Sequence, residues 1–319
     1  MRLLKIGKND AGQRLDKFLT KAVKGLPPSL MYKYIRTKKI KVNRARTQQS
    51  YMLAEGDEIQ LFIRDEFFDI PERDEDALYR IQPKLDILYE DDNIMLLNKR
   101  PGVLVHEDTA AAENTLVLHM KAYLAQKGEY DPASEQSFAP ALCNRIDRNT
   151  GGIVVAAKNA EALREMNEWI REDRLRKFYL CAVHGTPAKK QATLTGWLRK
   201  NSAENTVEIS DKKREGFKNI ITKYRVLRTK GEASLLEVEL VTGRTHQIRA
   251  HMAHIGHPLM GDGKYGINRR ERERGYKFQA LYAYRLAFDY PSGDGILGYL
   301  NGKSFEIPRE QVWFLKDFE

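Results

Sequence analysis

An abrupt change of charge near residue 64 is the feature that most constrains how this chain can fold. Residues 1–63 hold 14 Lys and Arg against 5 Asp and Glu, a net charge of +9. Residues 64–79 hold 2 basic and 7 acidic residues, a net charge of −5. Because 319 residues are too many for one ordinary core, we predict a small domain over 1–63, an acidic linker over 64–83 and a large domain over 84–319.

The basic block also limits the class of partner. A concentration of positive charge in one module indicates binding to a polyanion such as RNA, although a solvated basic face without a partner is the alternative. The sequence shows no secretory signal and no apolar run near the roughly 18 residues that a membrane span needs. We therefore expect a cytoplasmic protein without a membrane partner, in which Cys143 and Cys181 are free thiols rather than a disulfide.

The N-terminal segment predicts two helices and a hairpin. Apolar residues at helical spacing favour a helix over 13–25, and Ser29 is a suitable N-cap for a second helix through residue 37. Short strand-like runs follow at 40–43 and 59–63. Cations crowd the end of the second helix and the turn after it, and we expect five of them to bind RNA: Lys33, Arg36, Lys38, Lys39 and Lys41.

The larger part of the chain alternates strands and helices. We predict a strand pair within 86–99, a buried strand over 153–157, a central strand over 178–183, and a strand over 235–241 followed by a helix that ends near Gly256. Asn159 is expected to cap a helix after the buried strand, and the Arg/Glu run 269–274 is expected to be a solvated loop. Together these elements predict an α+β fold with a mixed, largely antiparallel sheet.

Three residue types stand in contexts that suit chemistry. Asp147 lies between two arginines, just before Thr150, two glycines and a buried strand, where a turn can present a carboxylate while glycines let a substrate backbone approach. Tyr179 in the central strand offers an aromatic face and a hydroxyl, and Arg249 falls near the start of a helix. Read alone, Asp147 is more typical of a turn-capping aspartate and Tyr179 of a core aromatic, and a surface arginine is the alternative for Arg249.

Four stretches, taken together, change that balance: LNKRPGVLVH at 97–106, NRIDRNTGGIVVAAKN at 144–159, RKFYLCAVHG at 176–185 and LVTGRTHQIRAHMAHIGHPLMGD at 240–262. In this order they resemble the RluA-type family of pseudouridine synthases over residues 84–319. The N-terminal segment, with RLDKFL, IKVN and EGDEI, resembles the S-four RNA-binding module, named after a small-subunit ribosomal protein. The combination is most similar to the RluC and RluD branch, which modifies large-subunit ribosomal RNA.

The resemblance implies roles for particular residues. Asp147 would be the catalytic carboxylate, Arg249 its ion-pair partner and Tyr179 the residue that stacks on the target base. An arginine within a few ångströms would lower the pKa of such an Asp by about 1–3 units. Arg145 would fill the gap left when the target nucleotide is flipped out of the RNA. Arg244 and His246 are expected to bind substrate.

The implied reaction breaks the glycosidic bond of a uridine, turns the uracil and rejoins it through carbon. It requires no metal and no cofactor. We expect the enzyme to be a monomer that acts on ribosomal RNA. The carboxylate could attack the anomeric carbon or take a ribose proton to give a glycal, and both routes stay open. One competing hypothesis is a metal-dependent hydrolase with ligands from His246, His251, His254 and His257, although H-E-x-x-H is absent. A non-catalytic RNA-binding protein is the other.

Overall fold

The computed structural model describes residues 1–68, 77–106, 114–266, 269–273, 275–289 and 295–319. By its contacts the chain divides into two compact units. Unit 1 comprises 1–84, 118–141 and 157–164, and unit 2 comprises 85–117, 142–156 and 165–319. The division predicted from the sequence at residues 63 and 84 stays a prediction, and residues 69–76 of the predicted acidic linker lie outside the described residues.

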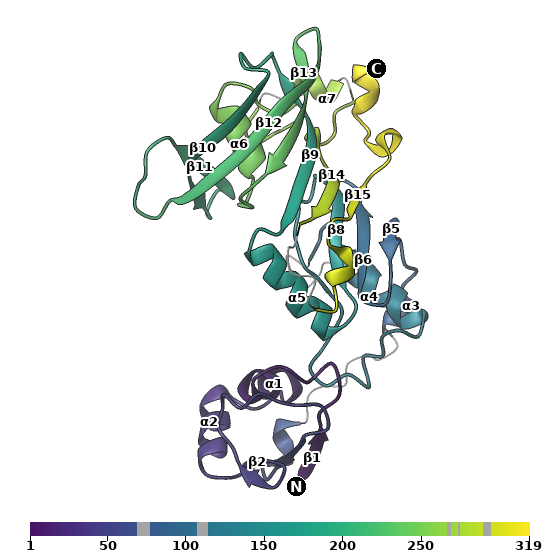
Figure 1. Cartoon of the computed structure of the whole chain (residues 1–319), viewed down its shortest axis with the longest axis vertical. Coiled ribbons are helices and arrows are strands. Elements are labelled where there is room, and N and C mark those ends of the chain that lie inside the picture. The colour runs from purple at the N-terminus through teal and green to yellow at the C-terminus, as the bar shows by residue number, and fades with distance from the viewer. Residues whose placement is uncertain (69–76, 107–113, 267–268, 274, 290–294) are drawn as a thin grey trace. The chain divides into compact units, whose positions relative to one another are not determined.

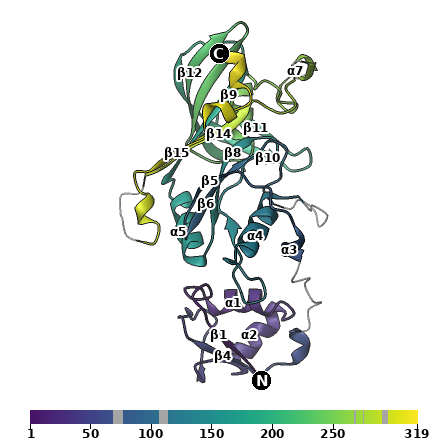
Figure 2. The same ribbon diagram turned by 90° about the vertical axis from the view of Figure 1, so that its right-hand side faces the viewer.

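Unit 1 contains the predicted pair of helices, α1 (Leu15–Ala22) and α2 (Pro28–Arg36), on one side of strands β1 and β4 (Figure 2). The sheet has the order β1-β4-β2-β3, with bounds Arg2–Lys5, Glu58–Leu61, Ile40–Val42 and Ala45–Arg46. Side chains such as Phe18, Met31 and Ile59 join helices and sheet in one apolar core. The prediction that Ser29 caps α2 is wrong: the N-cap is Pro27, and Pro28 occupies the first turn, where its missing N–H leaves no bond unmade.

The turn between β2 and β3 uses two residues with positive φ, Asn43 (51°) and Arg44 (65°). This backbone suits a tight hairpin, and Asn43 stabilises it because its side chain donates to Asp57 at 2.7 Å and accepts from the Glu58 N–H at 2.9 Å. The arginine is thereby presented at the tip of a well-fixed turn.

Segments far along the sequence complete unit 1. The remaining helical elements include a 3-10 turn (Asp65–Phe67), α3 (Ala77–Arg80), α4 (Leu116–Gln126) and the first residues of α5 (Ala160–Arg171). The buried carboxylate of Asp10 accepts hydrogen bonds from Ser137 Oγ at 2.6 Å and Gln136 Nε2 at 2.9 Å, and Asn9 donates to Glu135 at 2.6 Å. As predicted, Asn159 caps α5, because its Oδ1 accepts from the Ala162 N–H at 2.8 Å.

Unit 2 is built on a large mixed sheet (Figure 1). Within the described chain the strand order is β11-β10-β12-β13-β9-β14-β8-β6-β5, with β15 paired to β14 and β7 to β8. β14 and β8 are parallel, whereas β9 is antiparallel to both of its neighbours. The strand bounds are Ile87–Glu90 (β5), Ile94–Lys99 (β6), Ala141–Leu142 (β7), Gly151–Ala157 (β8), Leu175–His184 (β9), Gln191–Asn201 (β10), Thr206–Ser210 (β11), Lys218–Lys230 (β12), Ala233–Leu240 (β13), Leu281–Phe288 (β14) and Ser304–Glu306 (β15).

The predicted central strand is confirmed, since β9 lies in the middle of this order and six consecutive residues from Phe178 are buried. The helix predicted to end near Gly256 is α6 (Gln247–His254). The prediction of a solvated loop over 269–274 is wrong for the described residues, which form the short helix α7 (Arg269–Glu273). Glu271 of this helix is buried and lies 3.4 Å from His184 Nε2, a long-range contact that local charge does not reveal.

Candidate active site

The loop that enters β8 carries Asp147, and its shape is fixed by backbone contacts. The Thr150 N–H donates to the Asp147 carbonyl at 3.0 Å, and the Asn144 side chain accepts from the Val155 N–H at 2.8 Å. The interpretation that the glycines make room for substrate is not what the structure shows. A Cβ on Gly151 would lie 2.4 Å from the Tyr282 ring, and one on Gly152 (φ +118°) 2.2 Å from a backbone oxygen of β14, so both glycines let the two strands approach.

Lys99 anchors the same loop through hydrogen bonds, a role that the sequence analysis did not predict. Its side chain is buried at the end of β6, where Nζ donates to the carbonyl oxygens of Val103 and Arg148 at 2.8 Å and of Arg100 at 3.2 Å. Burial lowers the pKa of Lys99 to about 7, although the charge of Asp147 acts in the opposite direction. A lysine two positions after the apolar run of residues 94–97 was the available signal.

A chain of ion pairs runs from Asp147 into the core of unit 2. Arg249 Nη1 lies 2.8 Å from Asp147 Oδ2, while Arg249 Nε and Nη2 donate to the two carboxylate oxygens of Asp262 at 2.7 and 2.9 Å. The side chains of Asp262 and Arg249 are 0% and 6% exposed, but that of Asp147 is 26% exposed. Of these three ion-paired residues, Asp147 is therefore the only one that a large substrate can reach. Asp262 holds Arg249 through two parallel hydrogen bonds.

The ion-paired residues Asp262 and Arg249 shift each other's pKa values. Burial alone would raise the pKa of Asp262, but hydrogen bonds from Arg249 and the charge of Arg249 outweigh burial and lower it. Burial alone would lower the pKa of Arg249, and the two carboxylates raise it instead. Both groups are thus firmly charged in the folded protein. Asp262 closes the fourth motif, and the Gly-Asp that ends it was the signal for its role.

Tyr179 lies on β9 with its side chain 6% exposed, opposite Val238 of β13 and Ala283 of β14. Burial, and next the nearby charge of Asp147, raise the pKa of its hydroxyl. A phenol so situated stays protonated and can donate a hydrogen bond. The structure therefore brings Asp147, Arg249 and Tyr179 together.

The contacts of His246 favour one tautomer of its ring. The N–H of Val207 donates to the Tyr265 hydroxyl oxygen at 2.9 Å, so the Tyr265 proton is available to His246 Nδ1, also at 2.9 Å. Burial lowers the pKa of His246 to about 4, with Arg249 and Lys264 acting in the same direction and Asp147 against them. These contacts favour a neutral ring with its proton on Nε2, which faces Asp147 Oδ2 at 3.8 Å. Tyr265 is a second residue that the sequence did not reveal.

Other predicted residues lie at the surface. The side chains of Arg145 and Arg244 are exposed, and neither makes an ion pair with any residue in the described ranges. The five cations of unit 1 also have no carboxylate partner among the described residues, and Lys39 and Lys41 lie over the rings of Tyr34 and Phe62 at 5.2 and 5.6 Å. Of these five cations, Lys41 is half-buried and the other four are exposed: Lys33, Arg36, Lys38 and Lys39.

The four histidines of the competing hypothesis are engaged separately. His251 bonds with Thr222 at 3.0 Å, His254 with Asp211 at 2.9 Å and His257 with the His184 carbonyl at 2.9 Å. Over the part of the chain that the structure describes, no three His, Cys, Asp or Glu side chains are grouped to hold a metal ion. None of the helices in that part is long and apolar enough to cross a membrane.

Comparison with known proteins gives consistent matches. The family model described as RNA pseudouridylate synthase matches residues 93–254. "Ribosomal large subunit pseudouridine synthase C" of Salmonella typhi is 33% identical over 306 residues, 92% of this chain and 91% of that protein. The protein of the same name from Escherichia coli (strain K12) is 32% identical over 302 residues, 91% and 89% of the two chains.

Solved structures agree on the fold. "Human RNA Pseudouridylate Synthase Domain Containing 4" matches with a TM-score of 0.56 at 20% identity, covering 73% of this chain and 92% of that one. "Human RNA Pseudouridylate Synthase Domain Containing 1" gives 0.53 at 22% identity, covering 74% and 94%. At this level of identity the likeness concerns the arrangement of strands and helices.

Proposed function

The chain belongs to the RluA-type family of RNA pseudouridylate synthases, and from that premise we propose that it isomerises specific uridines of large-subunit ribosomal RNA to pseudouridine. The names of its relatives, which act on the large ribosomal subunit, support ribosomal RNA as the substrate. The observation that carries the proposal is the ion-pair chain in which only Asp147 is open to a substrate.

Asp147 is the proposed reactive group. Arg249 holds one of its oxygens, Oδ2, and the other oxygen, Oδ1, is left to act on a bound ribose. A carboxylate held in this way is ready either to attack the anomeric carbon or to take a ribose proton. Arg249 keeps the carboxylate charged and oriented, and Asp262 keeps Arg249 in place.

The residues around Asp147 are proposed to handle the base. Tyr179 gives an aromatic face to the uracil ring and a protonated hydroxyl that can donate to it. His246 directs Nε2 toward the same carboxylate, and the exposed guanidinium of Arg244 is available for a phosphate. Arg145 lies on the same loop, has no ion-pair partner among the described residues, and is proposed to fill the stack from which the uridine has been flipped.

The five cations of unit 1 are proposed to bind the phosphate backbone of the RNA, as an S-four module over residues 1–63 would. Cationic side chains that have no carboxylate partner among the described residues can neutralise RNA phosphates, which releases the counterions bound to the RNA. The acidic linker is proposed over 64–83 and the catalytic domain over 84–319. We also propose that the enzyme works as a cytoplasmic monomer and needs no cofactor.

Tritium release from carbon-5-labelled uridine in large-subunit ribosomal RNA transcripts tests the proposal. The wild-type protein is expected to release tritium, and Asp147→Asn is expected to release none while binding the same RNA, because an amide can neither attack nor accept the proton. Full activity of Asp147→Asn would refute the mechanism. Binding without release on every large-subunit fragment would favour the non-catalytic alternative.

A further inference from the structure

A cavity in unit 2 lies on the face of the sheet opposite to the Tyr179 side chain. Tyr282 precedes Ala283 on β14, and Ala283 is the Cα partner of Tyr179, so the Tyr282 side chain points to the opposite face. The cavity on that face has a volume of about 640 Å³ and is lined mainly by residues from β6, the segment after α7, β14 and the C-terminal segment. That volume lies within the range of about 300–1,000 Å³ that small-ligand sites occupy.

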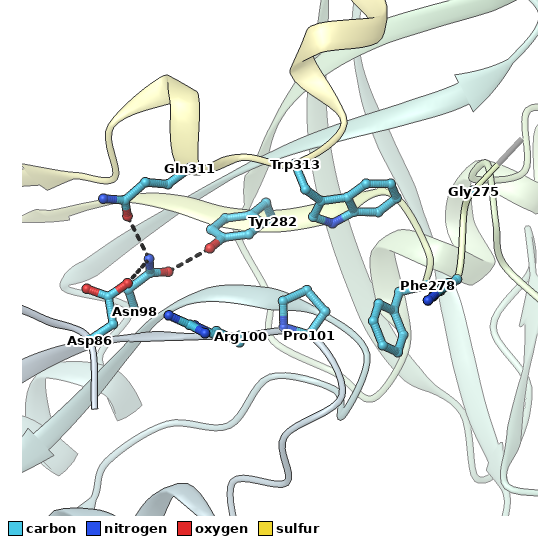
Figure 3. A pocket seen from close by; sticks show the side chains of 10 residues that line it. Asp86, Asn98, Arg100, Pro101, Gly275, Phe278, Tyr282, Gln311 and Trp313 are labelled. Atoms are coloured by element: carbon cyan, nitrogen blue, oxygen red, sulfur yellow. Dashed lines mark hydrogen bonds between the residues drawn. The ribbon is translucent and has the colours of Figure 1, made fainter. Parts of the chain in front are cut away.

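Aromatic and cyclic side chains form the walls of this cavity. Figure 3 shows the rings of Tyr282 and Trp313 on one side, Pro101 across from them, and Phe278 at one end. Trp313 is fixed by edge-to-face contacts with Tyr276 and Phe314, with ring centroids 5.1 and 5.2 Å apart. Such a slot suits a planar ring that stacks on its walls.

The polar end of the cavity is already organised. Asn98 Oδ1 accepts from the Tyr282 hydroxyl at 2.7 Å, and Asn98 Nδ2 donates to Asp86 at 2.8 Å and to Gln311 at 2.9 Å (Figure 3). These bonds tie β6, β14 and the C-terminal segment to one another. The cavity is therefore formed before any ligand arrives, which lowers the entropy that a ligand must lose on binding.

The charge of the lining favours an anion. Arg100 and Lys277 line the cavity, both are exposed, and neither makes an ion pair with a residue that the structure describes. Asp86 is the one acidic residue of the lining, and it already accepts from Asn98. A planar ring with a negative group would stack on the aromatic walls and pair with the two cations. A nucleotide is the common biological molecule of that kind.

The cavity is joined to the loop that carries Asp147. The N–H of Gly102, next to Pro101, donates to the Arg148 carbonyl at 2.9 Å, and the Tyr282 ring covers Gly151. Summing covalent steps of about 3.8 Å and this bond, Pro101 and Asp147 are separated by no more than roughly 15 Å between Cα atoms. An RNA strand engaged at Asp147 can span that distance within a few nucleotides of the reacting one.

We propose that this cavity binds an unpaired nucleotide of the RNA substrate, with its base between Trp313, Phe278 and Pro101 and its phosphate at Arg100 and Lys277. The inference rests on the proposed RNA substrate but concerns a nucleotide other than the one that reacts. It makes the cavity a determinant of which RNA is held, outside the chemistry at Asp147.

The test uses the full-length protein and a fluorescently labelled single-stranded 12-nucleotide RNA. Lys277→Gln is expected to weaken binding and to reduce the slope of log K against log salt by about 0.7, the value for one phosphate contact in a single strand. Lys316→Gln, which removes the same charge from an exposed residue outside the lining, is the matched control and is expected to leave the slope unchanged.

Phe278 tests the stacking. Phe278→Leu keeps apolar volume and is expected to weaken RNA binding about 10-fold, within the range for one base–aromatic stack, while Phe278→Tyr is expected to restore it. With 4-thiouridine in the RNA, cross-links to Trp313 or Phe278 are expected in Asp147→Asn as well as in wild type. If Phe278→Leu fails to fold, Lys277→Gln and the cross-links decide.

Three results would overturn the proposal: equal behaviour of Lys277→Gln and Lys316→Gln, cross-links only outside the lining, or tighter binding of free uridine or adenosine monophosphate than of the RNA. The last would assign the cavity to a free nucleotide. Wild-type tritium release separates the two claims. Release without any effect of the cavity variants refutes this inference alone, whereas cavity cross-links without release refute the proposed enzyme function alone.

Discussion

Replacing Asp262 with Asn removes the inner end of the ion-pair chain while keeping the size of the side chain. Asp262 Oδ2 accepts from Arg249 Nε at 2.7 Å, and Oδ1 accepts from Arg249 Nη2, the Lys264 N–H and the Tyr265 N–H at 2.9, 2.9 and 3.3 Å. All four contacts need an acceptor. An Asn whose oxygen stays with the two backbone donors turns its NH₂ toward Arg249 Nε, which donates as well.

The expected loss of stability follows from burial. Removing one partner of a buried ion pair costs about 3–5 kcal/mol, because the remaining charge stays buried without compensation. Arg249 keeps Asp147, which is partly exposed, so we expect about 3 kcal/mol. Arg249 would also lose its bidentate anchor, and a misplacement of about 1 Å in such a group can lower kcat about 100-fold.

The pH dependence gives a second signature. The folded protein holds the pKa of Asp262 below its usual value, so around that value the unfolded state binds more protons than the folded state. The stability that this carboxylate contributes is present above its unfolded pKa of about 3.9, and it is lost as the pH falls through the lower folded pKa. The stability difference between wild type and Asp262→Asn should therefore narrow below about pH 4.

Urea unfolding followed by tryptophan fluorescence measures these differences in the relevant part of the molecule. The chain has three tryptophans, Trp169, Trp197 and Trp313, and all belong to unit 2. Asp211→Asn is the control, because its side chain is 82% exposed in its pair with His254, and such pairs contribute less than about 1 kcal/mol. Equal stability and equal kcat for Asp262→Asn and wild type would refute the reasoning.

Three other substitutions test separate contacts. Tyr265→Phe removes the donor to His246 Nδ1 and frees the tautomer, so kcat should fall about 10-fold while KM for the RNA stays near the wild-type value, and a raised KM with unchanged kcat would contradict this. Lys99→Met deprives three carbonyl oxygens of their donor, so the free energy of unfolding should fall by about 2–3 kcal/mol in the same urea assay. A variant as stable as wild type would rule out this anchoring. Replacing Lys38, Lys39 and Lys41 together with Gln should lower the salt slope of RNA binding by about 2–3, and an unchanged slope would remove unit 1 from the RNA interface.

The sequence predicted the strands and helices best where the pattern was local. The apolar run of β8, the Asn159 cap and the central strand β9 each follow from neighbouring residues. The long β10 and β12 were not predicted. Both strands alternate buried and exposed residues only in part, because much of each strand faces solvent, and β12 also carries five Lys and Arg residues. The buried Glu271 of α7 was missed for the opposite reason, since its partner is 87 positions earlier along the chain at His184.

The candidate site divides in the same way. The meeting of Asp147 with Arg249, 102 residues apart in the sequence, was predicted from a family resemblance and not from spacing. Asp262 and Tyr265 contact the site because the chain turns back after α6, at the glycine-supported turn around Gly261, and no periodicity reports such a return. Lys99 looked like a polar strand end, and only the three converging carbonyls give it a role.

The pairing of β14 with both β9 and β8 sets the order in which the enzyme can become active during its synthesis. Tyr179 has Ala283 as its partner, and Gly151 has Tyr282, so the strand that backs the catalytic loop is made more than 100 residues after it. Domains form as the chain emerges at about 5–20 residues per second, and contacts between distant segments must wait for the later one. A nascent chain that already displays Asp147 therefore lacks the strand that shapes its loop for several seconds.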